Sequence, residues 1–129
     1  MDRKQQAMEP ERQRMSFLYQ RLASIGKTSG KDLKTRLKGM PVALRTSGLA
    51  VVAAQLNASD CPEDKRIGDL LAPWLLTHAT VFSGEKQGEK MRDLLEQCVQ
   101  ASRLEYEAAQ QEALRLMEQA KLLALALWS

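Results

Sequence analysis

Apolar residues recur every three or four positions through most of the chain, which is the spacing of one buried face of an α-helix. The first run with this spacing is Met15, Leu18, Leu22 and Ile25. Proline at position 10 suits the first turn of a helix, and Gly26 suits its end. The pattern predicts a helix from residue 10 to about residue 25, preceded by a polar stretch, residues 1–9, that is expected to fray.

Residues 31–56 carry two further apolar stripes. These are Leu33, Leu37, Met40 and Leu44, and then Leu49, Val52, Ala53 and Leu56. Pro41 lacks an N–H and its ring clashes with the preceding turn, which predicts a kink at Met40-Pro41. Gly48 suits the left-handed end of a helix, and Thr46 or Ser47 would cap the next one. Ahead of this helix–kink–helix unit, residues 27–30 are typical of a connector, with Ser29 and Asp32 spaced as a capping box.

The next segment begins in a loop, residues 57–64. Asp60 or Cys61 would cap the following helix, with Pro62 in its first turn. Its buried stripe is Ile67, Leu70, Leu71, Trp74 and Leu75. Pro73 is expected to kink this helix. Residues 83–88 hold two glycines and no apolar residue, which indicates a second loop.

Everything after about residue 89 keeps helical spacing without Gly or Pro and predicts one long helix of ~50 Å or more. No segment shows the period-two alternation of a strand. We therefore expect an all-α fold, a compact bundle of about five to six helices with a long C-terminal helix. The 129 residues suit a single domain, residues 1–129.

Composition places the chain among globular proteins, with 44% hydrophobic and 27% charged residues. No apolar run reaches the ~18 residues of a membrane span, and the N-terminus has no apolar signal region. Two cysteines, Cys61 and Cys98, make no disulfide framework and are expected to be free thiols. These features predict a cytoplasmic protein with no membrane partner.

Positive charge is concentrated in the first part of the sequence. Residues 1–48 hold 11 Lys/Arg against 4 Asp/Glu, a net charge of +7, while residues 49–129 hold 8 against 12, or −4. On a helix, Lys31, Lys34, Lys38 and Arg45 fall within about 60° of one another. Arg14 and Arg21 flank the apolar stripe of the first helix. This asymmetry predicts an anionic partner, the alternative being a solvated face without one.

No residue pattern points to catalysis, a metal or a cofactor. Gly26-Lys27-Thr28 resembles the end of a phosphate-binding loop, but Arg21 stands where the motif needs glycine. His78 has no nearby ligand or carboxylate constellation, and the cysteines have no CxxC partner. Few and scattered aromatic residues make a base-stacking platform unexpected, so any nucleic acid would be held through its phosphates, without sequence readout.

The C-terminal segment is strongly apolar. Leu122, Leu123, Leu125, Leu127 and Trp128 cover nearly the whole helix circumference. Either Leu125, Leu127 and Trp128 contact a partner or another copy, or the segment wraps against the first helix.

Two motifs resemble a known family. Leu37, Pro41, Leu44 and the run Ser47-Gly48-Leu49, followed by an apolar helix, are similar to the small all-helical subunit of type III-B CRISPR effector complexes. The last helix agrees at Arg103, Tyr106, the run Glu112-Ala113-Leu114, Lys121, Ala124 and Ala126. Ser47 stands where the family often has asparagine, an exchange that keeps a capping residue.

The resemblance implies a non-catalytic protein of antiviral defence. Such subunits stack as a filament, contact the large and backbone subunits, and line the channel that holds guide and target RNA. Carried onto this chain, the implied RNA-phosphate contacts are Lys31, Lys34, Lys38, Arg45, Arg14 and Arg21. The alternative is a helical protein–protein adaptor whose basic face meets an acidic protein and whose apolar C-terminus docks a partner helix.

Overall fold

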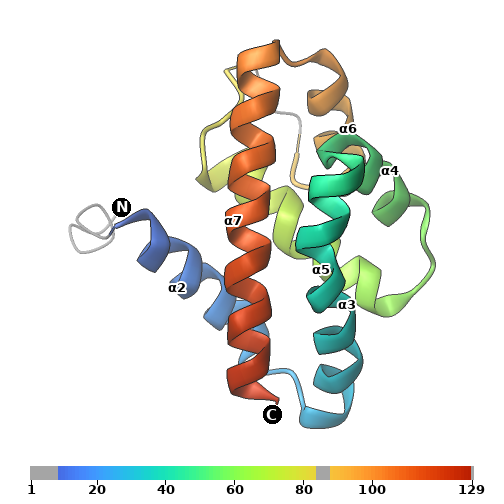
Figure 1. Cartoon of the computed structure of the whole chain (residues 1–129), viewed down its shortest axis with the longest axis vertical. Coiled ribbons are helices and arrows are strands. Elements are labelled where there is room, and N and C mark those ends of the chain that lie inside the picture. The colour runs from blue at the N-terminus through green and yellow to red at the C-terminus, as the bar shows by residue number, and fades with distance from the viewer. Residues whose placement is uncertain (1–8, 84–87, 129) are drawn as a thin grey trace.

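Helix α7 (Arg103–Leu127) is the longest element, and α2, α3, α4 and η1 all contact it (Figure 1). The structure, a computed structural model, describes residues 9–83 and 88–128. These residues form six α-helices and one π turn, and no strand occurs among them. The prediction of an all-α fold with a long C-terminal helix is confirmed.

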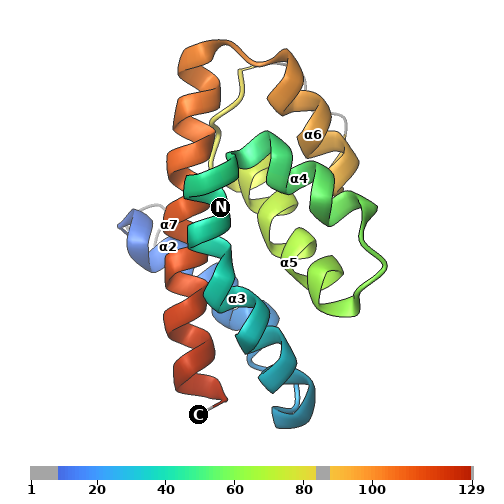
Figure 2. The same cartoon turned by 45° about the vertical axis from the view of Figure 1, so that its right-hand side comes forward.

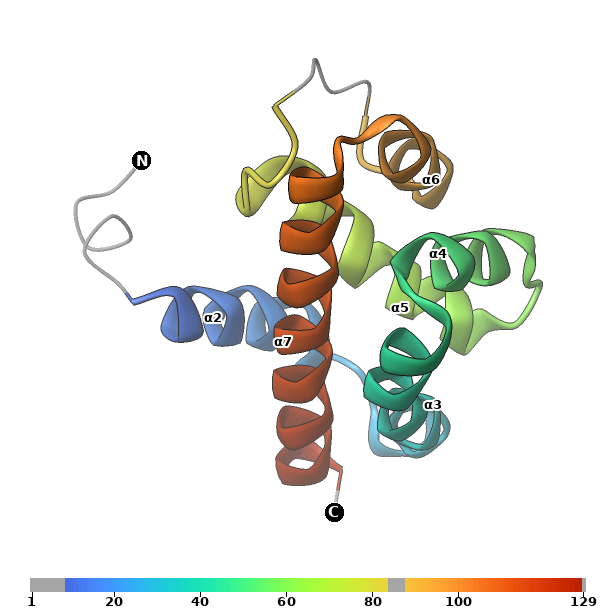
Figure 3. The same cartoon turned by 45° about the horizontal axis from the view of Figure 1, so that its top comes forward.

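The other helices lie on two sides of α7. Helix α2 (Pro10–Leu22) is on one side and α3 (Lys27–Ser47) on the other in Figures 1 and 3. Helices α4 (Leu49–Ala58), α5 (Pro62–Pro73) and α6 (Met91–Gln100) contact one another, and they gather on the α3 side in Figure 2. The π turn η1 (Trp74–His78) continues directly from α5.

The predicted apolar stripes form the core. Fully buried members include Leu18 and Leu22 of α2, Leu33, Leu37 and Leu44 of α3, Leu49 of α4, and Ile67, Leu71 and Leu75 of α5 and η1. Burial of each such side chain contributes about 1.5–3 kcal/mol to folding. The helical spacing of apolar residues therefore located most of the core. Met15, predicted to be buried, is half-buried and lies outside the core, whereas Phe17 is buried and was not predicted.

The predicted single helix after residue 89 is wrong, because the chain breaks at Ala101 and Ser102 into α6 and α7. The Ser102 side chain accepts a hydrogen bond from the Glu105 N–H, and the Glu105 carboxylate accepts one from the Ser102 N–H, both at 3.2 Å. This capping box satisfies two N–H groups that a helix start leaves unpaired. Its Ser-x-x-Glu signature is present in the sequence.

The predicted helix boundaries around α3 are also corrected, whereas the kink expected at Pro41 stays a prediction. Helix α3 runs from Lys27 to Ser47 without interruption, and Pro41 lies inside it with a buried side chain. Pro41 has no N–H to donate to the carbonyl one turn earlier in the helix. Its ring packs in the interior of the protein instead. Residues 27–30 form the first turn of α3, so Gly26 is the N-cap and Ser29 is not. The first helix ends at Leu22, three residues before Ile25.

Gly48 joins α3 to α4 with φ 87° and ψ 161°; the positive φ favours glycine, but the pair of angles is not the left-handed helical cap that was predicted. Neither Thr46 nor Ser47 caps α4. Two side chains of α7 do so: Gln110 Oε1 accepts from the Leu49 N–H at 2.6 Å, and Tyr106 Oη accepts from the Ala50 N–H at 3.0 Å. Gln110 Nε2 also donates to the Leu44 carbonyl at 2.7 Å, so one amide joins the end of α3 to the start of α4.

Helix α5 begins as predicted, with Pro62 in its first turn and Cys61 as N-cap, although the Cys61 side chain makes no capping bond. Pro73 is followed by a π turn, in which the Ala79 N–H donates to the Trp74 carbonyl at 2.8 Å. Loss of the proline N–H accounts for a local change of helix type at this point. The expectations for residues 1–8 and 84–87 lie outside the described residues.

Candidate nucleic-acid interface

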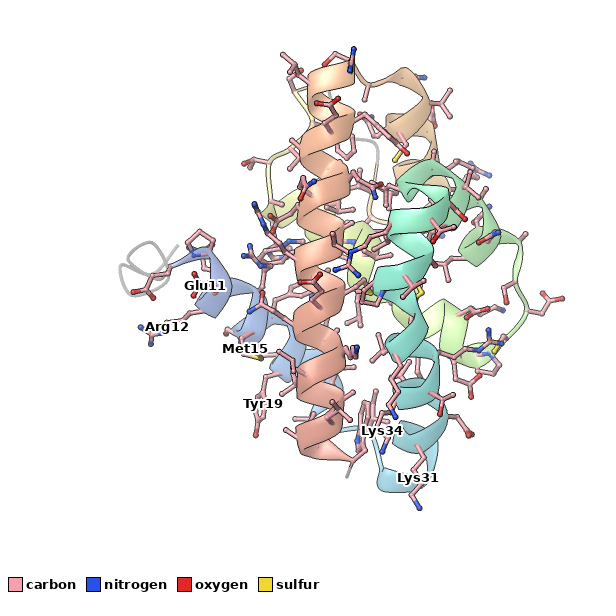
Figure 4. All side chains as sticks on the ribbon, viewed as in Figure 1. Glu11, Arg12, Met15, Tyr19, Lys31 and Lys34 are labelled. Atoms are coloured by element: carbon pink, nitrogen blue, oxygen red, sulfur yellow. The ribbon has the colours of Figure 1, made fainter. Side chains whose placement is uncertain are left out.

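Four cationic side chains lie along the flank of α3 that adjoins α7: Lys31, Lys34, Lys38 and Arg45. We call this set the α3 strip. Its position is fixed at two points, because Lys34 Nζ donates to the Trp128 carbonyl at 3.2 Å and Arg45 pairs with Glu118. Figure 4 shows Lys31 and Lys34 at the same end of α3. At 1.5 Å per residue the strip is about 21 Å long.

The four members of the strip differ in availability. Lys31 and Lys38 are exposed, and their side-chain ammonium groups make no hydrogen bond or ion pair with the residues that the structure describes. Lys34 is half-buried, and Arg45 is 55% exposed but engaged with Glu118. An anionic ligand would meet two free ammonium groups at once and would compete with α7 for the other two.

Helix α7 contributes a further cation, Lys121, which was not predicted as an RNA contact. Glu118 and Trp128 touch the strip, and Lys121 lies three residues beyond Glu118, on the same helical edge. Lys121 is half-buried there. Its helical spacing is visible in the sequence, but only the packing of α7 against α3 shows which edge faces the strip.

Arg14 does not belong to this surface. The residue is buried, at 6% exposure, and its guanidinium donates to Glu112 at 3.0 Å and to Gln119 at 2.6 Å. The Trp74 indole N–H shares the same Glu112 oxygen at 2.9 Å. The expected phosphate contact by Arg14 is therefore at odds with this structure, in which the residue ties α2 to α7.

Arg21 is exposed but lies on α2, apart from the strip. Its guanidinium carbon is 3.7 Å from the centroid of the Phe17 ring, a cation–π geometry. His78 packs on the same aromatic ring with centroids 5.0 Å apart. Partial burial, and then the positive charge of Arg21, lower the pKa of His78 below its usual range, which disfavours the charged imidazolium.

The apolar C-terminal segment divides between core and surface. Trp128 is buried, with its indole N–H donating to the Ile25 carbonyl at 3.3 Å. A Cβ added at Gly30 would lie 2.4 Å from the Trp128 ring, so glycine is needed at this contact. Trp128 is therefore not available to a partner. Leu127 is half-buried, and Leu125 is 38% exposed.

A separate exposed apolar area lies on α2 and α7. Leu122 is 61% exposed in a shallow hollow of about 360 Å³ at the seam of the two helices, which Glu11, Arg115 and Gln119 also line. Tyr19 is 54% exposed, and Figure 4 shows it with Met15 on the outer side of α2. Leu122 and Tyr19 are thus exposed apolar side chains that a partner could reach on this side of α7. Leu125 is seven residues beyond Glu118, about two helical turns, and therefore lies on the edge of α7 beside the strip.

A hollow of about 390 Å³ lies between α3, α4 and the start of α5. Its two charged residues, Arg36 and Asp64, pair with each other at 3.7 Å. Near its rim the Cys61 thiol donates to Glu63 at 2.8 Å and accepts from Arg36 at 3.3 Å. Burial raises the pKa of the other thiol, Cys98, to about 11. Both cysteines are free, as expected.

The residues that the structure describes contain no cluster of three or more His, Cys, Asp or Glu side chains that could hold a metal ion. None of their helices has the length and apolar character needed to cross a membrane.

Comparison with known proteins gives one match. A family model described as CRISPR-associated protein (Cas_Cmr5) matches residues 10–127. The matched range holds every helix described above, the α3 strip included. No curated protein and no solved structure matches this chain.

Proposed function

We propose a function for this chain that starts from its membership of the Cas_Cmr5 family of CRISPR-associated proteins, the small subunit of type III-B complexes. We propose that the α3 strip contacts the phosphate backbone of guide or target RNA. In this proposal the protein has no catalytic role of its own. Copies of it stack as a filament that lines the RNA channel in the cytoplasm, as part of antiviral defence.

The observation that carries the proposal is the pair of unengaged lysines, Lys31 and Lys38, on one flank of one helix. Lysine ammonium groups bind phosphate as point charges, and such contacts position RNA without reading its sequence. Lys34 and Arg45 lie on the same flank of α3, and Lys121 extends the positive surface onto the neighbouring edge of α7. A channel wall that must accept any guide sequence needs this kind of contact.

Association with other subunits is the second part of the proposal. The exposed apolar side chains Tyr19, Leu122 and Leu125 lie on α2 and α7. A contiguous exposed apolar patch commonly marks a site of protein association, and we infer that these side chains contribute to one. We assign this area to contacts with a neighbouring copy or with the backbone and large subunits.

The deciding experiment is purification of the tagged protein from its native host, with mass spectrometry of the partners and sequencing of bound RNA. Recovery of a multi-subunit complex with repeat-derived guide RNA is expected. Recovery of the protein alone, or with unrelated partners and no guide RNA, would contradict the proposal and favour a helical adaptor.

The role of the strip is tested separately in the assembled complex. The double variant Lys31→Ala/Lys38→Ala removes two expected phosphate contacts, which should lower the slope of log affinity against log salt by about 0.7–0.9 for each contact. The matched control is Lys65→Ala/Arg66→Ala, which removes the same charge from exposed positions on α5. Equal slopes for the two double variants would show that the RNA lies elsewhere.

A further inference from the structure

A second cationic surface, built differently from the α3 strip, lies where α2 meets the π turn. It has a buried aromatic floor made by Phe17 and Trp74, each 5% exposed, with ring centroids 4.9 Å apart. The indole N–H of Trp74 donates to Glu112, which Arg14 also binds. The floor is therefore held in place by a buried polar network and does not depend on any ligand for its shape.

Two exposed planar side chains cover this floor. The Arg21 guanidinium lies over Phe17, and the His78 ring stacks on Trp74 with an interplanar angle of 10° and centroids 5.5 Å apart. We call the pair Arg21 and His78 the planar pair. Both side chains combine a flat face with N–H groups at the edge, and both are orientated by the aromatic rings beneath them.

The π turn explains how His78 reaches this position. Trp74 and His78 are four residues apart, and the wider turn places the two rings nearly parallel. π turns of this length are rare and occur frequently at functional sites. The π turn could not be predicted from the spacing of apolar residues, because a single π turn has no apolar period that distinguishes it from an α-helix.

The charged residues around the planar pair leave the Arg21 guanidinium without an ion-pair partner among the described residues. It donates one hydrogen bond to the Phe17 carbonyl at 3.4 Å, and no carboxylate among the described residues forms an ion pair with it. Glu89, which lies near enough to influence both Arg21 and His78, is hydrogen-bonded to Thr77 at 3.0 Å. The guanidinium thus keeps free N–H donors at its edge.

We propose that the planar pair binds one unpaired RNA nucleotide, with its base stacked on the flat side chains and its phosphate accepting hydrogen bonds from Arg21. Single-stranded RNA is held in this way, by stacking on aromatic and guanidinium planes together with contacts to the backbone. An acidic peptide would use the charge but not the flat, aromatic-backed surface. The inference rests on the proposed RNA-binding function and adds a contact on the α2 side of α7, away from the strip.

The test compares two RNA oligomers of equal length, an oligoadenylate and its abasic counterpart, which has the same phosphates and no bases. Fluorescence anisotropy with the full chain, at concentrations up to millimolar, should show at least about fivefold tighter binding of the oligoadenylate. Arg21→Lys keeps the charge but loses the plane, and it should abolish this preference. His78→Ala should reduce it. Arg12→Lys, a surface exchange on the same helix, is the matched control and should change nothing.

Each other outcome has a definite meaning. Equal binding of both oligomers by the wild-type chain, or an unchanged preference in Arg21→Lys and His78→Ala, would overturn the inference and leave the proposed function intact. Absence of binding to either oligomer would also overturn the inference. It would leave the proposed function open, because that function is tested with the assembled complex. An oligoglutamate peptide that displaces the oligoadenylate at equal concentration would show a general anion site instead. The Lys31→Ala/Lys38→Ala variant should weaken both oligomers equally, which separates the two surfaces.

Discussion

Two arginines pair with glutamates that are six positions apart on α7, and the two ion pairs differ strongly in how far they are exposed to solvent. Arg14 and Glu112 are 7% and 14% exposed in their side chains, whereas Arg45 and Glu118 are 55% and 45% exposed. The first pair lies between α2 and α7, and the second lies at the edge of the α3 strip. The same chemistry therefore serves one site that holds the fold together and another that is open to a ligand.

The difference is one of solvation. A buried ion removed from its partner cannot recover its hydration, so breaking such a pair is costly. Exposed ions exchange a partner for water at little cost, and typical surface pairs contribute ~0–1 kcal/mol. An exposed arginine can therefore leave its glutamate for a phosphate, and a buried one cannot.

The largest effect is expected from Arg14→Ala. It leaves the Glu112 carboxylate buried with only the Trp74 N–H as partner, and should lower the free energy of unfolding by about 3–5 kcal/mol. Urea denaturation measures this. Arg12→Ala, which breaks an exposed pair with Glu9 on the same helix, should change the free energy by less than about 0.5 kcal/mol. Similar values for the two variants would refute the contrast between buried and exposed pairs.

Arg45→Ala should have the opposite profile. Its free energy of unfolding should fall by no more than about 1 kcal/mol, because the pair with Glu118 is exposed. RNA affinity of the assembled complex should fall, and the loss should be about threefold larger at 50 mM than at 200 mM salt, as for one phosphate contact. A loss that does not depend on salt would argue against a phosphate contact at Arg45.

The smallest effect is expected from Glu118→Gln, and it is a gain. In the proposed function RNA and Glu118 compete for Arg45, so neutralisation of Glu118 should raise RNA affinity by about 1.5- to 5-fold, the equivalent of one exposed ion pair. The control is Glu107→Gln, which removes the same charge from an exposed pair with Arg103 near the start of α7. If both variants raise the affinity equally, the gain reflects net charge alone and the competition at Arg45 is not supported.

Features that depend on local spacing could be predicted from the sequence. The apolar stripes of α3 and α5 became the core, and Lys31, Lys34, Lys38 and Arg45 occupy one flank of α3 because helical geometry fixes their relative angles. The positive φ at Gly48 followed from the freedom of glycine.

Features that depend on which helix lies opposite could not be predicted. Arg14 and Arg45 have the same charge and both flank an apolar stripe, and only the position of α7 decides which one is buried. Pro41 remains within α3 because its ring packs in the interior. The break at Ser102, by contrast, could have been predicted, because the sequence contains its Ser-x-x-Glu capping signature. The high helix propensity of the surrounding segment favoured one continuous helix instead.

The capping of α4 by α7 has a consequence for how the chain folds. The acceptors for the Leu49 and Ala50 N–H groups are synthesised 61 and 56 positions later, on the last helix of the described chain. Until α7 docks, the start of α4 has no side-chain cap, and Gly48 is not held between its neighbours. Closing such long loops before any contact is gained slows folding. We therefore expect the nascent chain to reach its native form in one late, concerted step, and not helix by helix as it leaves the ribosome.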